Sequence, residues 1–96
     1  MVYNFTEQEK WEIVGYVKVS KIRYEILKTI STEFLMPKEI AEITGYKSEQ
    51  ISKSLNSLKE KNLVFCLNEN LRKGRLYQNT ELGLEILSMI EKQEKQ

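Results

Sequence analysis

Apolar residues recur at helical spacing in five segments of the chain. The clearest series runs through residues 49–61, where Ile51, Leu55 and Leu58 follow one another at i, i+4 and i+7. Residues 7–18 give the weakest pattern, because Gly15 and several β-branched residues lower helix propensity. The segments expected to be helical are 7–18, 21–31, 37–44, 49–61 and 81–94.

Residues that favour helix ends flank these segments. Ser20, Ser48 and Thr80 are expected to be N-caps, because a hydroxyl oxygen accepts hydrogen bonds from the free N–H groups of the first turn. Pro37 suits a first helical turn, and Gly45 can take the left-handed conformation that ends a helix. These residues divide 37–61 into two short helices joined by a tight turn.

The expected helix that starts at Pro37 is amphipathic. Its inner face is predicted to consist of Ile40, Ala41 and Ile43. Glu39 falls in the first turn, where the helix dipole favours an acidic side chain. Asn62 is the expected C-cap of the next helix.

The pattern changes to strand-like after residue 62. Residues 63–67 and 75–79 are short, apolar and rich in strand formers, and a turn-rich loop separates them. Residues 34–36 form a further short extended piece before Pro37. The predicted fold is mainly α with a small β-hairpin, in the order helix, helix, extended piece, helix, helix, strand, strand, helix.

A length of 96 residues leaves room for one domain. We expect 1–96 to form it, with an N-terminal extension at 1–19, a helix-turn-helix at 37–61, a hairpin at 63–79 and a C-terminal helix at 81–94. The sequence has no apolar run long enough to span a membrane and no signal-peptide pattern, so a cytoplasmic location is expected.

Composition argues against an enzyme. The chain has no His and no Asp, which removes the catalytic arrangements that depend on them and the zinc sites built from Cys and His. It also lacks phosphate-binding and dinucleotide-binding glycine motifs, so no cofactor is expected. Cys66 lies in an apolar run and is expected to be a buried structural thiol.

Charge is distributed unevenly although the net charge is only +1. Residues 47–75 contain seven Lys or Arg and three Glu, a surplus of four positive charges, whereas 1–46 and 76–96 are slightly acidic. A basic middle between acidic ends is typical of a protein that presents one face to a polyanion. A solvated surface of mixed charge is the alternative.

Two short helices joined at a glycine and followed by a β-hairpin have the order of a winged helix-turn-helix. That motif favours a small residue where its helices cross, a glycine in the turn and an apolar residue facing back, and Ala41, Gly45 and Ile51 meet these requirements. In such motifs the second helix lies in the DNA major groove. We therefore expect double-stranded DNA as the partner.

The stretch PKEIAEITGYKSEQISKSLNSLKEKNLV from Pro37 to Val64 resembles winged-helix transcriptional regulators common in archaea, related to the arsenical-repressor and multiple-antibiotic-resistance-repressor groups. The stretch NENLRKGRLYQNTELG from Asn68 to Gly83 is similar to their wing. The resemblance implies the fold and sequence-specific DNA binding. Met36 departs from the Ser or Thr common before the proline, and the missing Cys and His exclude the metal sites of metal-sensing relatives.

The resemblance also implies a set of contact residues. Gln50 and Asn56 are expected to pair with adenine, and Lys53 with guanine or phosphate. The recognition-helix set is Lys47, Ser48, Gln50, Ser52, Lys53 and Asn56, and the wing set, expected on phosphates or in the minor groove, is Arg72, Lys73 and Arg75.

The last expected helix carries apolar residues on more than one side, since Leu84 lies off its main stripe. This pattern suits either a homodimer element or an intramolecular lid. The dimer residues are predicted to be Leu82, Ile86, Met89 and Ile90. The expected function is therefore that of a homodimeric transcriptional regulator. The alternative is a winged-helix protein-interaction module without DNA contact, which the low net charge and Glu49 favour.

Overall fold

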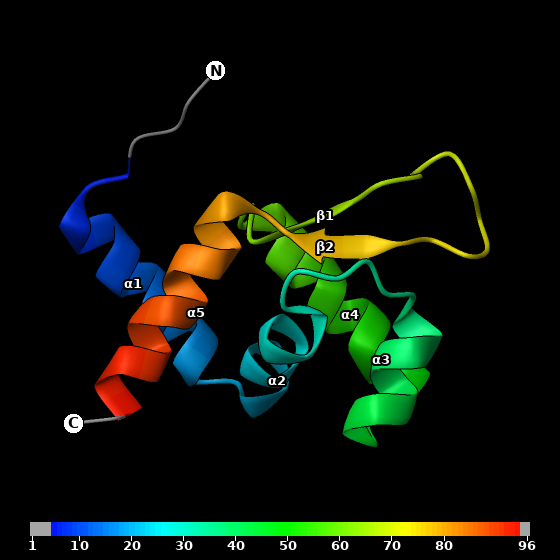
Figure 1. Cartoon of the computed structure of the whole chain (residues 1–96), viewed down its shortest axis with the longest axis horizontal. Coiled ribbons are helices and arrows are strands. Elements are labelled where there is room, and N and C mark those ends of the chain that lie inside the picture. The colour runs from blue at the N-terminus through cyan, green and yellow to red at the C-terminus, as the bar shows by residue number, and fades with distance from the viewer. Residues whose placement is uncertain (1–4, 95–96) are drawn as a thin grey trace.

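The computed structural model describes residues 5–94 (Figure 1). In it, the segments with helical periodicity form five helices, and the two strand-like segments form an antiparallel hairpin. The elements are α1 (Glu7–Lys18), α2 (Lys21–Ile30), α3 (Pro37–Thr44), α4 (Ser48–Glu60), β1 (Val64–Cys66), β2 (Tyr77–Asn79) and α5 (Glu81–Glu94). The order expected from the sequence is confirmed.

The short extended piece before α3 joins the hairpin. Leu35 and Tyr77 form an isolated antiparallel bridge, in which each backbone N–H donates to the other residue's carbonyl oxygen at 3.0 and 2.9 Å. Within the hairpin, Phe65 of β1 lies opposite Gln78 of β2. β2 is therefore paired along both edges near its start.

α2 lies at the centre of the molecule. It packs against the other four helices and against β2, with α1 and α5 to one side of it and α3 and α4 to the other (Figure 1). Its Ile26, Leu27 and Ile30 are fully buried. The core continues from α2 into α4 through Ile51, Leu55 and Leu58, the stripe that identified this helix in the sequence.

The N-terminal ends of the helices correct two expectations. Lys47, not Ser48, is the N-cap of α4, and the Gln50 side-chain oxygen accepts the Lys47 N–H at 3.1 Å. Ser20 occupies the N-cap position of α2, but its hydroxyl makes no capping hydrogen bond. Thr80 caps α5 as expected, because its Oγ1 accepts the Gly83 N–H at 3.0 Å.

The start of α3 explains how Met36 is tolerated there. A Glu39 side-chain oxygen accepts the Met36 N–H at 2.9 Å, so the acidic residue binds back to the N-cap backbone as in half of a capping box. Gly45 ends α3 in the left-handed conformation with φ of 82°. The expectation for Ile43 is wrong: its side chain is 65% exposed and faces away from the core.

α4 ends one residue earlier than expected. Lys61 is its C-cap, and Asn62 follows with φ of 60°, a left-handed conformation that Asn tolerates better than most residues. Leu63 and Val64 then enter the core.

The base of the hairpin is locked to two helices. Asn79 is buried, and its side-chain N–H groups donate to the carbonyl oxygens of Leu27 and Ser31 at the end of α2. Gly83 of α5 lies against the carbonyl oxygen of Leu63, where a Cβ would come within 2.1 Å. The strands therefore leave the core in a fixed direction. Of the helices described in residues 5–94, none combines the length and the apolar content that a bilayer-crossing segment needs.

Candidate nucleic-acid interface

α4 has a buried face and an exposed polar face. The buried stripe holds the helix against the rest of the core, which fixes its rotation about its own axis. The opposite face carries only polar and charged side chains, and they line a shallow depression along the first two turns. These residues are Ser48, Glu49, Gln50, Ser52, Lys53 and Asn56.

Within this face, the exposed residues repeat at helical spacing. Ser52, Lys53 and Asn56 lie at i, i+1 and i+4 on one side of the helix, and Glu49 lies one turn before them. Asn56 can donate and accept hydrogen bonds at once, and Lys53 can donate only. An exposed helix surface of this kind fits the dimensions of a DNA major groove.

Gln50 contributes to the N-terminal capping of α4, a role that was not predicted from the sequence. Its Oε1 accepts the Lys47 N–H, which holds this oxygen against the helix backbone, and its amide N–H groups are free. A bidentate contact with adenine needs both the oxygen and the nitrogen of the amide. In this conformation Gln50 helps to cap α4 and presents its amide N–H groups for contact with DNA.

The loop between β1 and β2 is held together by two side chains. The Asn68 Oδ1 accepts the Leu76 N–H at 2.8 Å, and its Nδ2 donates to the Gly74 carbonyl oxygen at 3.1 Å. The Arg75 guanidinium donates to the carbonyl oxygens of Leu71 and Glu69. We call Asn68 and Arg75 the wing clamp. The loop, residues 67–76, projects beyond α3 and α4 (Figure 1).

A surface ion pair joins this loop to α4. Lys59 in the last turn of α4 pairs with Glu69. The hydrogen bond from Lys59 lowers the pKa of the Glu69 carboxyl, and the same bond raises the pKa of the Lys59 ammonium. Both side chains are about half exposed, so solvent screening keeps the strength of this pair low.

The predicted contact residues therefore fall into separate groups. Lys47 and the polar residues of α4 lie exposed along one helix, and Arg72 and Lys73 are exposed at the loop tip. Arg75 differs, because it is half-buried and its guanidinium binds the loop backbone. The roles of Asn68 and Lys59 were not predicted from the sequence, although an Asn at the start of a turn-rich loop is a known turn signal.

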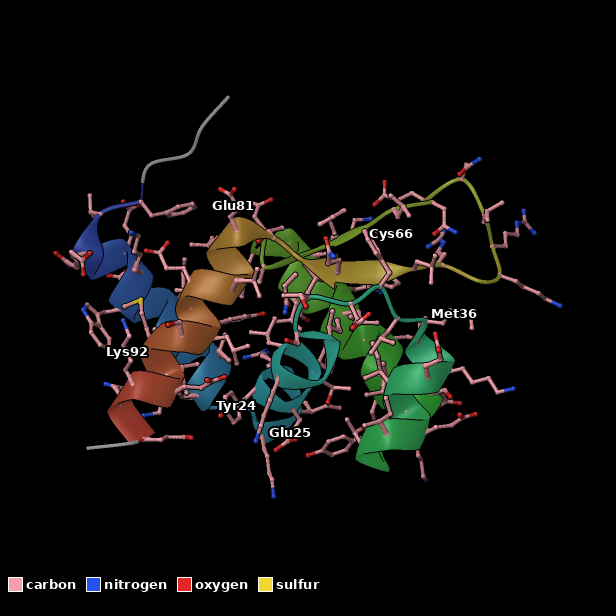
Figure 2. All side chains as sticks on the ribbon, viewed as in Figure 1. Tyr24, Glu25, Met36, Cys66, Glu81 and Lys92 are labelled. Atoms are coloured by element: carbon pink, nitrogen blue, oxygen red, sulfur yellow. The ribbon has the colours of Figure 1, made fainter. Side chains whose placement is uncertain are left out.

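The predicted dimer residues also divide. Ile86 and Ile90 are fully buried in the core of the chain, so they belong to the intramolecular face of α5 and the expectation for them is wrong. Leu82 and Met89 are half-buried. Met89 borders a small pocket with Trp11 of α1, whose side chain is 45% exposed. Figure 2 shows Lys92, which lines the same pocket, at the opposite end of the molecule from Met36 at the start of α3.

Cys66 and Tyr16 make contacts within the chain. Cys66 on β1 is half-buried rather than fully buried, and its Sγ lies 3.6 Å from the Asn68 Oδ1 (Figure 2). The Arg23 guanidinium stacks on the Tyr16 ring at 3.9 Å and donates to the Tyr16 carbonyl oxygen. Over residues 5–94, no three His, Cys, Asp or Glu side chains gather into a group that could hold a metal ion.

Solved structures with the same arrangement of elements include DNA-binding proteins, one of them a winged helix-turn-helix domain. TubR bound to 24 bp of tubC, from Bacillus thuringiensis serovar israelensis, is 15% identical with a TM-score of 0.78, covering 96% of this chain and 99% of its own. The homodimeric winged helix-turn-helix DNA-binding domain of Mb0332 from Mycobacterium bovis, a possible ArsR-family transcriptional regulator, is 19% identical with a TM-score of 0.71, covering 98% and 91%.

The chain has the winged-helix fold. A putative transcriptional regulator of the MarR family from Porphyromonas gingivalis is also similar, at 20% identity and a TM-score of 0.72, over 98% of this chain and 94% of that one. No family model and no curated protein sequence matches the chain. In winged-helix terms, α3 and α4 form the helix-turn-helix, α4 is the second helix, and the β1–β2 loop is the wing.

Proposed function

We propose that this chain is a sequence-specific DNA-binding regulator that places α4 in the major groove and the wing on the flanking backbone. The observation that carries the proposal is the polar face of α4, which is held outward by a fully buried apolar stripe. The local surplus of four positive charges in residues 47–75 supports it, because most affinity for DNA comes from cations near phosphates. The whole chain, as one domain, would act as the binding unit.

Within this proposal the contact residues have graded roles. Ser52, Lys53 and Asn56 face the bases, with Asn56 as the reader of adenine. Phosphates near the start of α4, where the helix dipole favours anions, are contacted by Lys47, Ser48 and the free amide N–H of Gln50. Arg72 and Lys73 contact phosphates from the wing tip.

The test is fluorescence anisotropy of labelled duplex DNA over a series of salt concentrations. Wild-type affinity should fall steeply with salt. The Arg72→Gln/Lys73→Gln variant should reduce the slope of log K against log salt by about 1.8, since each lost phosphate contact contributes about 0.9. The Lys21→Gln/Lys28→Gln variant removes the same charge from exposed positions of α2 and should leave the slope unchanged.

If the folded wild-type protein does not bind duplex DNA at low salt, the proposal is wrong. The chain would then be a winged-helix protein-interaction module, and its partners would be proteins.

We propose a homodimer as the DNA-binding form, because two copies double the number of base contacts a small module can make. The exposed Trp11 beside half-buried Met89 supports a contact surface on α1 and α5, in place of the buried Ile86 and Ile90. Analytical ultracentrifugation tests this. Met89→Glu should shift a wild-type dimer to monomer, and a wild type that sediments as a monomer at micromolar concentration would contradict the dimer.

A second candidate is a role in plasmid segregation, which the coverage of the TubR structures favours. A TubR mutant described as a type III plasmid segregation protein aligns over 100% of both chains with a TM-score of 0.79. Selecting bound fragments from the source genome separates the two candidates. A regulator's fragment should control a reporter gene, whereas a segregation site should stabilise a plasmid that carries it.

A further inference from the structure

The three wing cations predicted from the sequence differ in their surroundings. Arg72 and Lys73 are exposed, and within the described residues neither has a hydrogen bond or ion pair to the protein. Arg75 is half-buried, and two of its guanidinium nitrogens donate to the carbonyl oxygens of Leu71 and Glu69. A guanidinium used in this way has fewer N–H groups left for a phosphate.

Asn68 completes the arrangement from the other side of the loop. Its amide spans from the Leu76 N–H to the Gly74 carbonyl oxygen, which ties the beginning of the loop to its end. Gly74 adopts φ of 71°, a left-handed conformation that lets the chain return toward β2. The residues between the two anchors, 69–74, have only one backbone hydrogen bond of their own, from the Leu71 N–H to the Asn68 carbonyl oxygen.

We infer that the wing clamp, Asn68 and Arg75, is a pair of positioning residues that orders the loop so that Arg72 and Lys73 reach DNA phosphates together. This inference rests on the DNA-binding function proposed above. A disordered loop loses conformational entropy when it binds, which weakens the binding free energy. A loop that is already ordered avoids this loss. Arg75 therefore acts on DNA affinity through Arg72 and Lys73.

The first experiment uses the protein without DNA. Amide hydrogen exchange at Leu71 and Leu76 reports wing order, because both N–H groups bond within the loop. Arg75→Lys keeps the charge but has one side-chain nitrogen in place of the two that bind the Leu71 and Glu69 carbonyl oxygens. Exchange at both amides should therefore rise about fivefold, the factor for one ordinary hydrogen bond.

Asn68→Ala should have the same effect at Leu71 without any change of charge. Asn70→Ala, an exposed asparagine in the same loop, is the matched control and should leave exchange unchanged. Unchanged exchange in both Arg75→Lys and Asn68→Ala would overturn the inference.

The second experiment is a double-mutant cycle on DNA affinity. Arg75→Gln should weaken binding by roughly tenfold in the wild-type background, through the loss of aligned phosphate contacts. In the Arg72→Gln/Lys73→Gln background the same change should alter affinity by less than about twofold, since there is no charge left to position. Arg75→Lys should behave like Arg75→Gln in both backgrounds.

The outcomes separate the inference from the function it rests on. If Arg75→Gln has the same effect in both backgrounds and Arg75→Lys restores affinity, Arg75 contacts DNA itself and the positioning role is wrong. If the wild type binds no DNA, the proposed function fails together with the DNA half of the inference. The exchange measurement still decides whether the clamp orders the wing.

Discussion

α4 and the wing tip present neighbouring polar surfaces, but different forces hold them in place. α4 is fixed by Ile51, Leu55 and Leu58, which are buried among the other helices. The wing tip is fixed by side-chain hydrogen bonds from Asn68 and Arg75 and by one exposed ion pair. The helix should therefore keep its position when surface residues change, whereas the wing depends on a few polar side chains.

The largest effect should come from removing part of the stripe under α4. Leu55→Ala should lower the free energy of unfolding by about 2–5 kcal/mol, because it deletes buried methyl groups and leaves a cavity. Urea unfolding measures this. Asn56→Ala, the adjacent exposed position, should change stability by less than about 0.5 kcal/mol while it weakens DNA binding. Equal stabilities for the two variants would remove the contrast between the faces of α4.

The second largest loss of stability should come from a change at the base of the wing. The base is held by close backbone packing, whereas the tip is held by polar side chains. Gly83→Ala would drive a Cβ into the Leu63 carbonyl oxygen, so α5 and the start of β1 must separate. A loss of about 1–3 kcal/mol in unfolding free energy is expected from such overpacking.

Gly15→Ala is the control for this substitution. It also replaces a helical glycine, but among the described residues no atom beyond its chain neighbours and the backbone of its own helix lies within 4 Å of the added Cβ. It should raise stability by about 0.5–1 kcal/mol through helix propensity. A Gly83→Ala variant that melts at or above the wild-type temperature would show that the base of the wing yields easily.

The fold could be predicted from the sequence because its signals are periodic and local. The stripe in α4, Pro37 at the start of α3 and Gly45 at its end each imply one conformation, and each appears as expected. The prediction that Ile43 is buried was wrong because its spacing from Ile40 also suits an inner face. Only the packing of α3 shows that Ile43 points outward. The prediction that Ser48 is the N-cap was wrong because the helix begins one residue earlier than expected. Lys47 is the N-cap, and its N–H donates to the side chain of Gln50 in the first turn.

The site could be predicted only as a region. Sequence places cations in the wing, but charge alone does not show that Arg75 points at carbonyl oxygens while Arg72 and Lys73 point to solvent. The same holds for α5, whose apolar residues are equally compatible with a core and with a partner. Burial of Ile86 and Ile90 follows from how α5 packs on α1 and α2, which no single segment encodes.

The smallest effect should come from the ion pair that joins the two regions. The pKa of Glu69 is lowered in the folded protein, so its contribution is present above the ordinary value of 4.5 and is lost as the pH falls through the lowered value. The pKa of Lys59 is raised above 10.5, so the pair persists across neutral pH, and on the alkaline side it is lost only as the pH rises through this raised value.

Glu69→Gln isolates this effect from the other carboxylates that titrate in acid. At neutral pH the wing amides of the variant should be more mobile than those of the wild type in NMR relaxation, with no measurable change in Tm, since exposed pairs contribute little to stability. As the pH falls well below 4.5 the two proteins should converge, because the wild-type carboxyl then carries no charge. A difference in mobility that persists in acid would mean that Glu69 holds the wing by packing and not by its charge. α4 and the wing tip would then be joined independently of Lys59.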